Sequence, residues 1–174
     1  FNRLCMQNKN SEQAAAALGV DPDKVEVIGD PKFDSLQPLT VEDRNRLRKT
    51  FLLKEDTPVW VAGSTHTGEE EIILNAHQQL REKYPDLILI LAPRRIERIN
   101  EVVALLQKKN LSFARRSSLE ISEPVILLDT MGELAKVYSL GQMAFIGKSL
   151  IEPGGGHSLI EPLSQGLAVL HGPH

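Results

Sequence analysis

Leu87-Ile88-Leu89-Ile90-Leu91 decides the fold, because no polar residue interrupts this apolar run. A strand without polar alternation has both faces buried, as in a parallel sheet that helices cover on each side. The run ends in Ala92 and is followed at once by Pro93-Arg94-Arg95. The stretch therefore predicts a buried parallel strand with a basic loop at its carboxyl end.

Short apolar runs of the same kind alternate with helical patterns, which is typical of a parallel α/β sheet. The other predicted strands are residues 3–6, 25–28, 59–62, 125–128, 143–146 and 167–170. The predicted helices are 11–18, 40–51, 67–83, a segment around 99–106 and a short one after 133. Ser11, Thr40, Thr67 and Thr130 are the expected helix caps, the last two within capping boxes. Residues 112–123 are polar and predict no element.

We therefore expect an α/β fold with a Rossmann-like, mostly parallel sheet and helices on both faces. In such a sheet the loops that follow the strands lie along one edge, where ligands bind. Four of these loops carry polar, glycine or basic residues, namely Ser64-Thr65-His66, Pro93-Arg94-Arg95, Asp129-Thr130-Met131-Gly132-Glu133 and residues 153–162. These residues are predicted to converge on one edge of the sheet.

The last of these loops reads Pro153-Gly154-Gly155-Gly156-His157-Ser158-Leu159-Ile160-Glu161-Pro162. Consecutive glycines let the backbone adopt positive φ and pass close to a ligand. Backbone N–H groups bared in such a loop, with a helix N-terminus behind them, favour an anion. The alternative interpretation is a mobile surface loop that Ser158 and Glu161 cap.

The composition excludes some function classes. A chain of 174 residues with a net charge of −3 has no basic excess with which to bind nucleic acid in general. Cys5 stands alone, so no internal disulfide is expected. No apolar run reaches the ~18 residues of a membrane span, and no signal peptide is visible. Because both ends look cut, we expect the chain to be part of a longer protein.

Several motifs follow one another in an order that is more specific than any one of them. They are, along the chain, Gly29-Asp30-Pro31-Lys32-Phe33-Asp34, Ser64-Thr65-His66-Thr67-Gly68-Glu69-Glu70, Pro93-Arg94-Arg95 with Arg98, Leu128-Asp129-Thr130-Met131-Gly132-Glu133-Leu134, Phe145-Ile146-Gly147 with Ser149-Leu150, Gly155-Gly156-His157 with Glu161-Pro162, and Gly172-Pro173-His174. With these motifs the chain resembles, over nearly its whole length, the 3-deoxy-D-manno-octulosonic acid (Kdo) transferases of lipopolysaccharide assembly.

The resemblance implies a B-type glycosyltransferase of two Rossmann-like halves, with residues 1–174 as a single nucleotide-sugar (donor) binding domain in the C-terminal half. It implies CMP-Kdo as donor, lipid A or its precursor as acceptor, inversion at the anomeric centre, and neither metal nor cofactor in the transfer step. It places the catalytic base, the acceptor site and the membrane-facing surface in the other half. The piece alone is then expected to be soluble and inactive, and the whole enzyme to act at the cytoplasmic face of the bacterial inner membrane.

The sequence departs from the family pattern at a few positions of these motifs. Arg95 stands where a His is usual, Ser158 where an Asn is usual, and Lys148 where a second Gly is usual. Gly154 lengthens the glycine run. These positions bear on donor contacts, and they leave room for a different 2-keto sugar acid or a different number of transfers.

A site for CMP-Kdo needs hydrogen-bond donors and positive potential, because this donor carries a phosphodiester and a carboxylate. Arginine matches either group with its planar fork, and helix N-termini add N–H groups. Glu161 is a candidate acceptor from the ribose hydroxyls, and Met131 and Glu133 are candidates to frame the pyrimidine and ribose. The predicted donor-binding residues are Ser64, Thr65, His66, Arg94, Arg95, Met131, Gly132, Glu133, Gly155, Gly156, His157, Ser158 and Glu161. No catalytic residue and no metal ligand is predicted in this piece.

Plainer interpretations remain for each of these residues, as helix caps or a solvated helix start. Two other functions also remain open. One is a nucleotide-sugar 2-epimerase of the same fold. The other is a receiver-type signalling domain, because Asp129 follows an apolar strand, although such a site needs further acids where this chain has Ser64-Thr65-His66.

Overall fold

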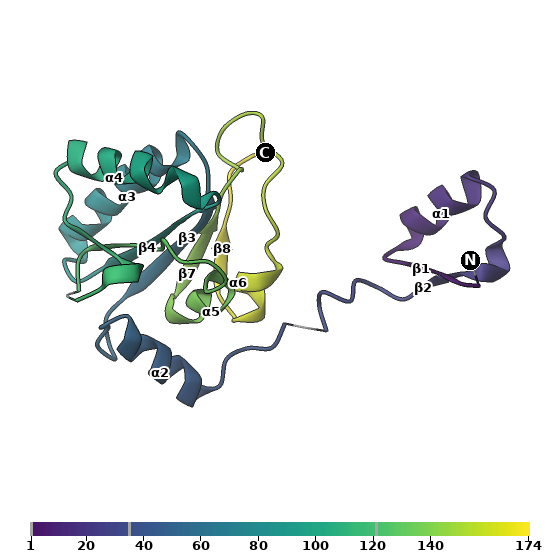
Figure 1. Cartoon of the computed structure of the whole chain (residues 1–174), viewed down its shortest axis with the longest axis horizontal. Coiled ribbons are helices and arrows are strands. Elements are labelled where there is room, and N and C mark those ends of the chain that lie inside the picture. The colour runs from purple at the N-terminus through teal and green to yellow at the C-terminus, as the bar shows by residue number, and fades with distance from the viewer. Residues whose placement is uncertain (1, 35, 121) are drawn as a thin grey trace. The chain divides into compact units, whose positions relative to one another are not determined.

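The structure is a computed structural model that describes residues 2–34, 36–120 and 122–174, and the chain divides into two compact units, residues 1–37 and 38–174 (Figure 1). The first unit contains β1 (Leu4–Met6), α1 (Lys9–Ala17), a 3-10 turn at Pro22–Lys24 and β2 (Val25–Val27). β1 and β2 pair in parallel, so the unit is a small β-α-β arrangement. The interpretation of residues 1–174 as one donor-binding domain stays a prediction.

The second unit holds a six-stranded sheet in the order β5-β6-β4-β3-β7-β8, and every pair in it is parallel. Its strands are β3 (Val59–Thr65), β4 (Ile88–Pro93), β5 (Phe113–Arg115), β6 (Val125–Leu127), β7 (Met143–Ile146) and β8 (Ala168–Leu170). Its α-helices are α2 (Val41–Thr50), α3 (Glu69–Lys83), α4 (Ile99–Lys108), α5 (Leu134–Val137) and α6 (Ile160–Ser164). Short 3-10 turns at Ile96–Arg98, Arg116–Ser118 and Tyr138–Leu140 complete it. The predicted α/β fold class is confirmed.

The order of the strands creates a switch point between β3 and β7. From β3 the chain moves outward through β4 to β5 and β6, and it then returns to place β7 on the other side of β3. In open parallel sheets a ligand crevice lies at this point, outside the carboxyl ends of the strands. The loops after β3 and β7 therefore flank the position that the topology favours for a ligand.

Helices cover both faces of the sheet, and nearly all side chains of the central strands β3 and β4 are therefore buried. On one face Val61, Ile90 and Ile146 pack with Phe51 and Tyr138, from the segments around α2 and α5. The opposite face packs against α3 and α4. The burial of both faces explains why the 87–91 run shows no polar alternation.

A buried polar pair joins the sheet to α3. The indole Nε1 of Trp60 donates to Nδ1 of His77 at 3.1 Å, and His77 Nε2 donates to the Pro124 carbonyl at 3.0 Å. Burial lowers the pKa of His77 to about 4. His77 is therefore a neutral core residue that accepts the hydrogen bond from the buried indole N–H of Trp60.

Most predicted elements are present, with corrections at helix starts. Asn8, not Ser11, caps α1, since its side chain accepts from the Ser11 N–H. Gly68 stands at the N-cap of α3 without a side-chain bond, so the predicted Thr67 cap is wrong. Likewise Glu133 stands at the N-cap of α5 in place of Thr130.

β5 was not predicted, because it is a three-residue strand inside a polar stretch whose residue 121 lies outside the described residues. Within the described part of the chain, no helix is long and apolar enough to cross a membrane.

Candidate functional site

The ends of β3 and β7 approach each other closely at the switch point. Ser64 has φ of +56°, and the pairing of β3 with β4 shifts register at this residue. A Cβ at Gly147 would lie 2.2 Å from the Ser64 carbonyl oxygen, so only glycine fits there. Lys148, the next residue, has φ of +62°. Left-handed backbone at two non-glycine residues is strained and persists only where the surroundings enforce it.

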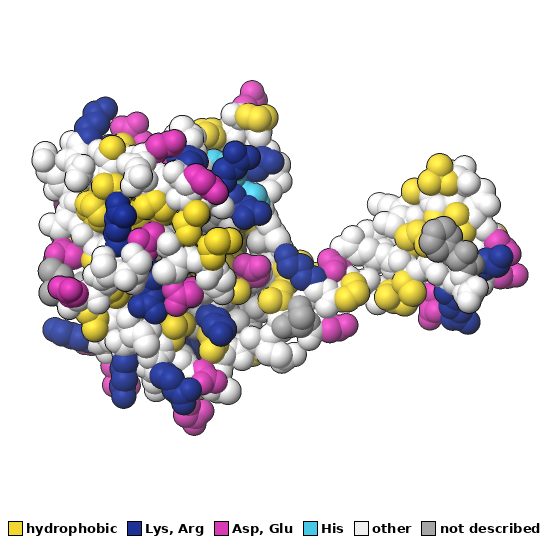
Figure 2. Space-filling view, in the orientation of Figure 1, with side chains coloured by type: hydrophobic (Ala, Val, Ile, Leu, Met, Phe, Trp, Pro, Cys, Tyr) yellow, Lys and Arg dark blue, Asp and Glu magenta, His cyan; other side chains and the backbone are white. Residues whose placement is uncertain are grey.

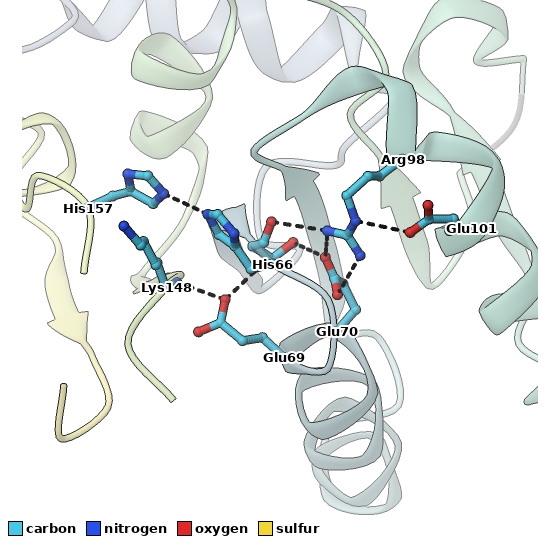
Figure 3. A network of polar contacts seen from close by, with 8 residues as sticks. His66, Glu69, Glu70, Arg98, Glu101, Lys148 and His157 are labelled. Atoms are coloured by element: carbon cyan, nitrogen blue, oxygen red, sulfur yellow. Dashed lines mark hydrogen bonds and ion pairs between the residues drawn. The ribbon is translucent and has the colours of Figure 1, made fainter. Parts of the chain in front are cut away.

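The side chain of Glu69 holds the backbone of both loops in this conformation (Figure 3). Its buried carboxylate accepts four backbone N–H bonds, from His66 at 2.9 Å, Lys148 at 2.8 Å, Ser149 at 2.9 Å and Leu150 at 3.0 Å. Burial alone would raise the pKa of Glu69, but the four N–H bonds prevail and lower it. One carboxylate thus fastens the loop after β3 to the loop after β7.

The neighbouring Glu70 ties the same region to β4. Its buried carboxylate accepts from the Thr65 hydroxyl at 3.0 Å and from both terminal nitrogens of Arg98, at 2.8 and 3.2 Å. Arg98 also bonds Glu101 at 3.1 Å. Thr65, a predicted donor contact, is fully buried, so its hydroxyl serves this network.

His66 and His157 meet although 91 residues separate them in the sequence. Their Nε2 atoms lie 2.9 Å apart, and the rings stack with centroids 5.1 Å apart and an interplanar angle of 21°. Burial is the main cause that lowers the pKa of each imidazole, and the charge of Lys148 lowers both further. Arg94 also lowers the pKa of His157, which places the end of β4 near this pair.

Arg94 and Arg95 line a surface groove of about 350 Å³ together with the loop after β6. The groove is formed by Pro93, Arg94, Arg95, Ile96, Glu97, Leu128, Thr130, Met131 and Gly132. Both arginines are exposed, and the ion pairs among the described residues include neither side chain. Met131 is 84% exposed, so an apolar side chain stands beside free cations. This combination suits a ligand with both a flat ring and anionic groups.

Glu133 lies in a network of its own. Its carboxylate accepts from Arg116 at 3.1 and 3.2 Å and from the Thr130 hydroxyl. Burial opposes ionisation, but Arg116 and Thr130 prevail and lower the pKa of Glu133. Asp129 accepts from the Ser117 N–H at 2.8 Å and from its hydroxyl at 2.7 Å. Nothing in this arrangement favours a receiver-type phosphorylation site.

The glycine loop folds back over the switch point. Gly155 and Gly156 have φ of +108° and +55°, and the Gly156 N–H donates to the Lys148 carbonyl at 2.8 Å. A Cβ at Gly154 would lie 1.9 Å from the His174 side chain, so the final motif packs against this loop. Ser158 accepts from the Ile160 N–H at 3.4 Å. The positive φ that the glycine run predicts is present at Gly155 and Gly156, and the close passage to a ligand stays a prediction.

Most of the predicted residues fall into two groups along one edge, while Glu133 lies in its separate network with Arg116 and Glu161 lies on α6. Those after β3 and β7 meet at the histidine pair, and four others share the groove, namely Arg94, Arg95, Met131 and Gly132. The first group is linked to the second through Glu70 and Arg98. Figure 2 shows His side chains beside Lys and Arg side chains on one face of the second unit.

Sequence reasoning missed the importance of three residues. Glu69 and Glu70 were assigned to a helix cap, and Lys148 appeared only as a departure from a motif. Two consecutive acids at the start of the helix that follows β3 were the available signal for Glu69 and Glu70. In the described residues, no group of three or more His, Cys, Asp or Glu could hold a metal ion.

Comparison with known proteins gives consistent matches. The chain is 42% identical to the 3-deoxy-D-manno-octulosonic acid transferase of Haemophilus influenzae over 98% of its own length and 40% of that protein. It is 37% identical to the bifunctional glycosyltransferase/methyltransferase of Fusobacterium nucleatum over 97% of its own length and 26% of that protein. The chain thus spans well under half the length of these relatives. No protein-family model matches it.

A solved structure agrees with these relatives. The C-terminal CMP-Kdo binding domain of WaaA from Acinetobacter baumannii superimposes with a TM-score of 0.67 at 38% identity. The match covers 74% of this chain and 67% of that domain. The second unit, residues 38–174, is long enough to account for the whole match.

Proposed function

This chain belongs to the 3-deoxy-D-manno-octulosonic acid transferase family, and from that premise we propose that it supplies the part that binds CMP-Kdo. The observation that carries the proposal is the pair of free arginines in the groove beside Met131. Exposed guanidinium groups without a carboxylate partner are free to bind a phosphate or carboxylate with two parallel hydrogen bonds. A nucleotide sugar with both anions fits this edge.

The donor is proposed to lie along the carboxyl edge of the sheet. Arg94 or Arg95 holds the phosphodiester or the sugar carboxylate, and Met131 and Gly132 lie against the pyrimidine or ribose. At the switch point, the wall of the proposed donor site is formed by His66, Gly155, Gly156 and His157. Glu161, on α6, accepts from ribose hydroxyls.

Two predicted donor residues form hydrogen bonds with other residues of the chain. Glu133 bonds Arg116, and Thr65 bonds Glu70. We propose that both act by positioning the loops rather than by leaving their partners for the donor.

The reaction of the whole enzyme is proposed as inverting, metal-independent transfer of Kdo to lipid A or its precursor. Transfer requires a base within hydrogen-bond reach of the acceptor hydroxyl and a cleft without water. The carboxylates nearest the histidine pair are Glu69 and Glu70, and both are fully engaged. The base, the acceptor site and any contact with the inner membrane at its cytoplasmic face are therefore proposed to belong to the rest of the protein.

Donor binding is tested by calorimetric or NMR titration of the 174-residue chain with CMP and UMP. We expect a high micromolar to millimolar Kd for CMP, which is roughly −4 to −6 kcal/mol, because only part of the cleft is present. CMP should bind more tightly than UMP, and the chain alone should transfer no Kdo. Equal affinity for UMP, or measurable transfer, would contradict the proposal.

The arginines are tested by Arg94→Ala and Arg95→Ala. Loss of a charge-assisted pair costs about 1.5–3 kcal/mol, so at least one variant should bind CMP-Kdo roughly ten- to a hundredfold more weakly. Lys83→Ala is the control, since Lys83 ends α3 and so carries a like charge at the opposite edge of the sheet. If both arginine variants bind as the parent does, the groove is not the donor site.

A further inference from the structure

The contact between His66 and His157 fixes how many protons the pair can carry. Two nitrogens 2.9 Å apart attract each other only when one of them donates an N–H to the lone pair of the other. The pair can therefore be neutral, or it can take up one proton on an outer nitrogen and become a monocation. A second added proton would set two N–H groups against each other and break the contact.

The charged groups around the pair leave it without an anionic partner. Glu69, Glu70, Arg98 and Lys148 act on His66, and Lys148, Glu69 and Arg94 act on His157. Both carboxylates are already committed, Glu69 to four backbone N–H groups and Glu70 to Arg98. Neither accepts a hydrogen bond from an imidazole.

The remaining neighbours are cations. The ion pairs within the described part of the chain include neither Arg94 nor Lys148, and Figure 3 shows Lys148 beside the two rings. Both histidines are only half-buried, so a ligand can reach them. Two cations near the pair, Arg94 and Lys148, therefore lack a carboxylate partner at the point where the topology favours a ligand.

Resting on the proposed function, we infer that His66 and His157 form an oxyanion subsite for the donor, and that an anion binding there brings one proton into the pair. The anion is the phosphodiester or the carboxylate of the donor, which share this chemistry. The monocation keeps the ring-to-ring hydrogen bond and directs the outer N–H groups to the anion. Binding and protonation thus favour each other.

The direction of the pH dependence follows from linkage. Burial and the neighbouring cations outweigh the opposing charge of Glu69 and lower the pKa of both rings, so the pair without an anion is neutral at pH 7. An anion in contact favours the charged form, and the pair then binds more protons with ligand than without. Affinity should therefore rise as pH falls, by at most about tenfold per pH unit for one proton.

The experiment is isothermal titration calorimetry of the full chain with two separate probes. One is the methyl phosphodiester of CMP, whose phosphate keeps one charge throughout, unlike CMP, whose phosphomonoester titrates near pH 6. The other is free Kdo, which carries only the carboxylate. Measurements at pH 7 in two buffers of different ionisation enthalpy count the protons taken up, and a pH 6–7.5 series gives the affinity.

We expect net proton uptake with at least one probe and an affinity about three- to tenfold higher at pH 6 than at pH 7.5. Uptake with the methyl ester assigns the subsite to the phosphodiester, and uptake with Kdo alone assigns it to the carboxylate. His66→Gln and His157→Gln, which keep a polar side chain without a titrating group, should abolish the uptake. His171→Gln, at an exposed histidine that belongs to neither ring of the pair, should retain it.

The possible failures are distinguishable. Binding of both probes without proton uptake, or uptake that persists in both glutamine variants, overturns this inference and leaves the proposed function standing. If neither probe binds, the proposed function falls and the inference with it.

Discussion

The carboxyl edge of the sheet has two halves that differ in how their charges are satisfied. In the fastened half, residues 64–70 and 147–150, buried carboxylates meet backbone N–H groups and Arg98. In the open half, the groove of Arg94, Arg95, Met131 and Gly132, the cations have no such partners. Stability and binding are therefore separated along one edge. Variants that remove the buried carboxylates of the fastened half should destabilise the protein, and variants that remove the arginines of the open half should change what it binds.

The largest expected effect is that of Glu69→Ala. It leaves four backbone N–H groups without their acceptor, and each buried group left unpaired costs about 1–3 kcal/mol. We expect a loss of about 4 kcal/mol in the free energy of unfolding, measured by urea denaturation. Glu82→Ala, at an exposed position of the same helix, should change it by less than about 0.5 kcal/mol. A loss below about 1 kcal/mol for Glu69→Ala would mean that the two loops are not held by this carboxylate.

The second effect compares one glycine from each half. Gly147→Ala places a Cβ 2.2 Å from the Ser64 carbonyl oxygen, which is backbone and cannot turn aside, so about 3 kcal/mol should be lost. Gly132→Ala meets no atom within 4 Å and carries only the cost of φ at +80°, about 1 kcal/mol. Thermal or urea unfolding of both variants measures the difference. Equal losses would remove the contrast between the halves.

The third effect is a pH dependence that arises at His77, which lies in neither half. His77 has a pKa of about 4 in the folded chain, against about 6.5 when unfolded. Below pH 6.5 the unfolded chain binds the proton and the folded chain does not, so stability is lost as pH falls towards 4. The loss between pH 8 and pH 5 should be about 2 kcal/mol.

The measurement is a series of urea denaturation curves across this pH range. His66 and His157, whose pKa values are also lowered, contribute with the same sign. His77→Gln should be less stable at pH 8, because it disturbs the bond to Trp60, and should show a flatter pH profile. An unchanged slope in this variant would assign the dependence to other groups.

The smallest effect concerns stability in the open half. Arg94→Ala and Arg95→Ala remove exposed side chains without ion pairs, so each should change the free energy of unfolding by less than about 0.5 kcal/mol. The same variants are those expected to weaken donor binding. Destabilisation by more than 1 kcal/mol would show that the groove also holds the fold together.

The sequence predicted the features that depend on local pattern and on the rule for parallel sheets. The 87–91 run revealed a strand buried on both faces, and residues that follow strands, such as Arg94 and His157, were correctly assigned to one edge. The role of Glu69 was not predicted, because an acidic residue at a helix start also fits a capping box. Its partners, such as Lys148, lie about 80 residues away in the sequence and become visible only once β7 is placed beside β3.

The bond between Trp60 and His77 determines what intrinsic tryptophan fluorescence can report about this protein. The sequence contains one tryptophan, so all indole emission comes from a ring buried in the core, 5% exposed and joined to a histidine that stays neutral above about pH 4. Trp60 lies near the start of β3, whereas the candidate site lies past its end at Thr65. Intrinsic fluorescence is therefore a label-free monitor of unfolding, while ligand binding is better followed by heat or by NMR.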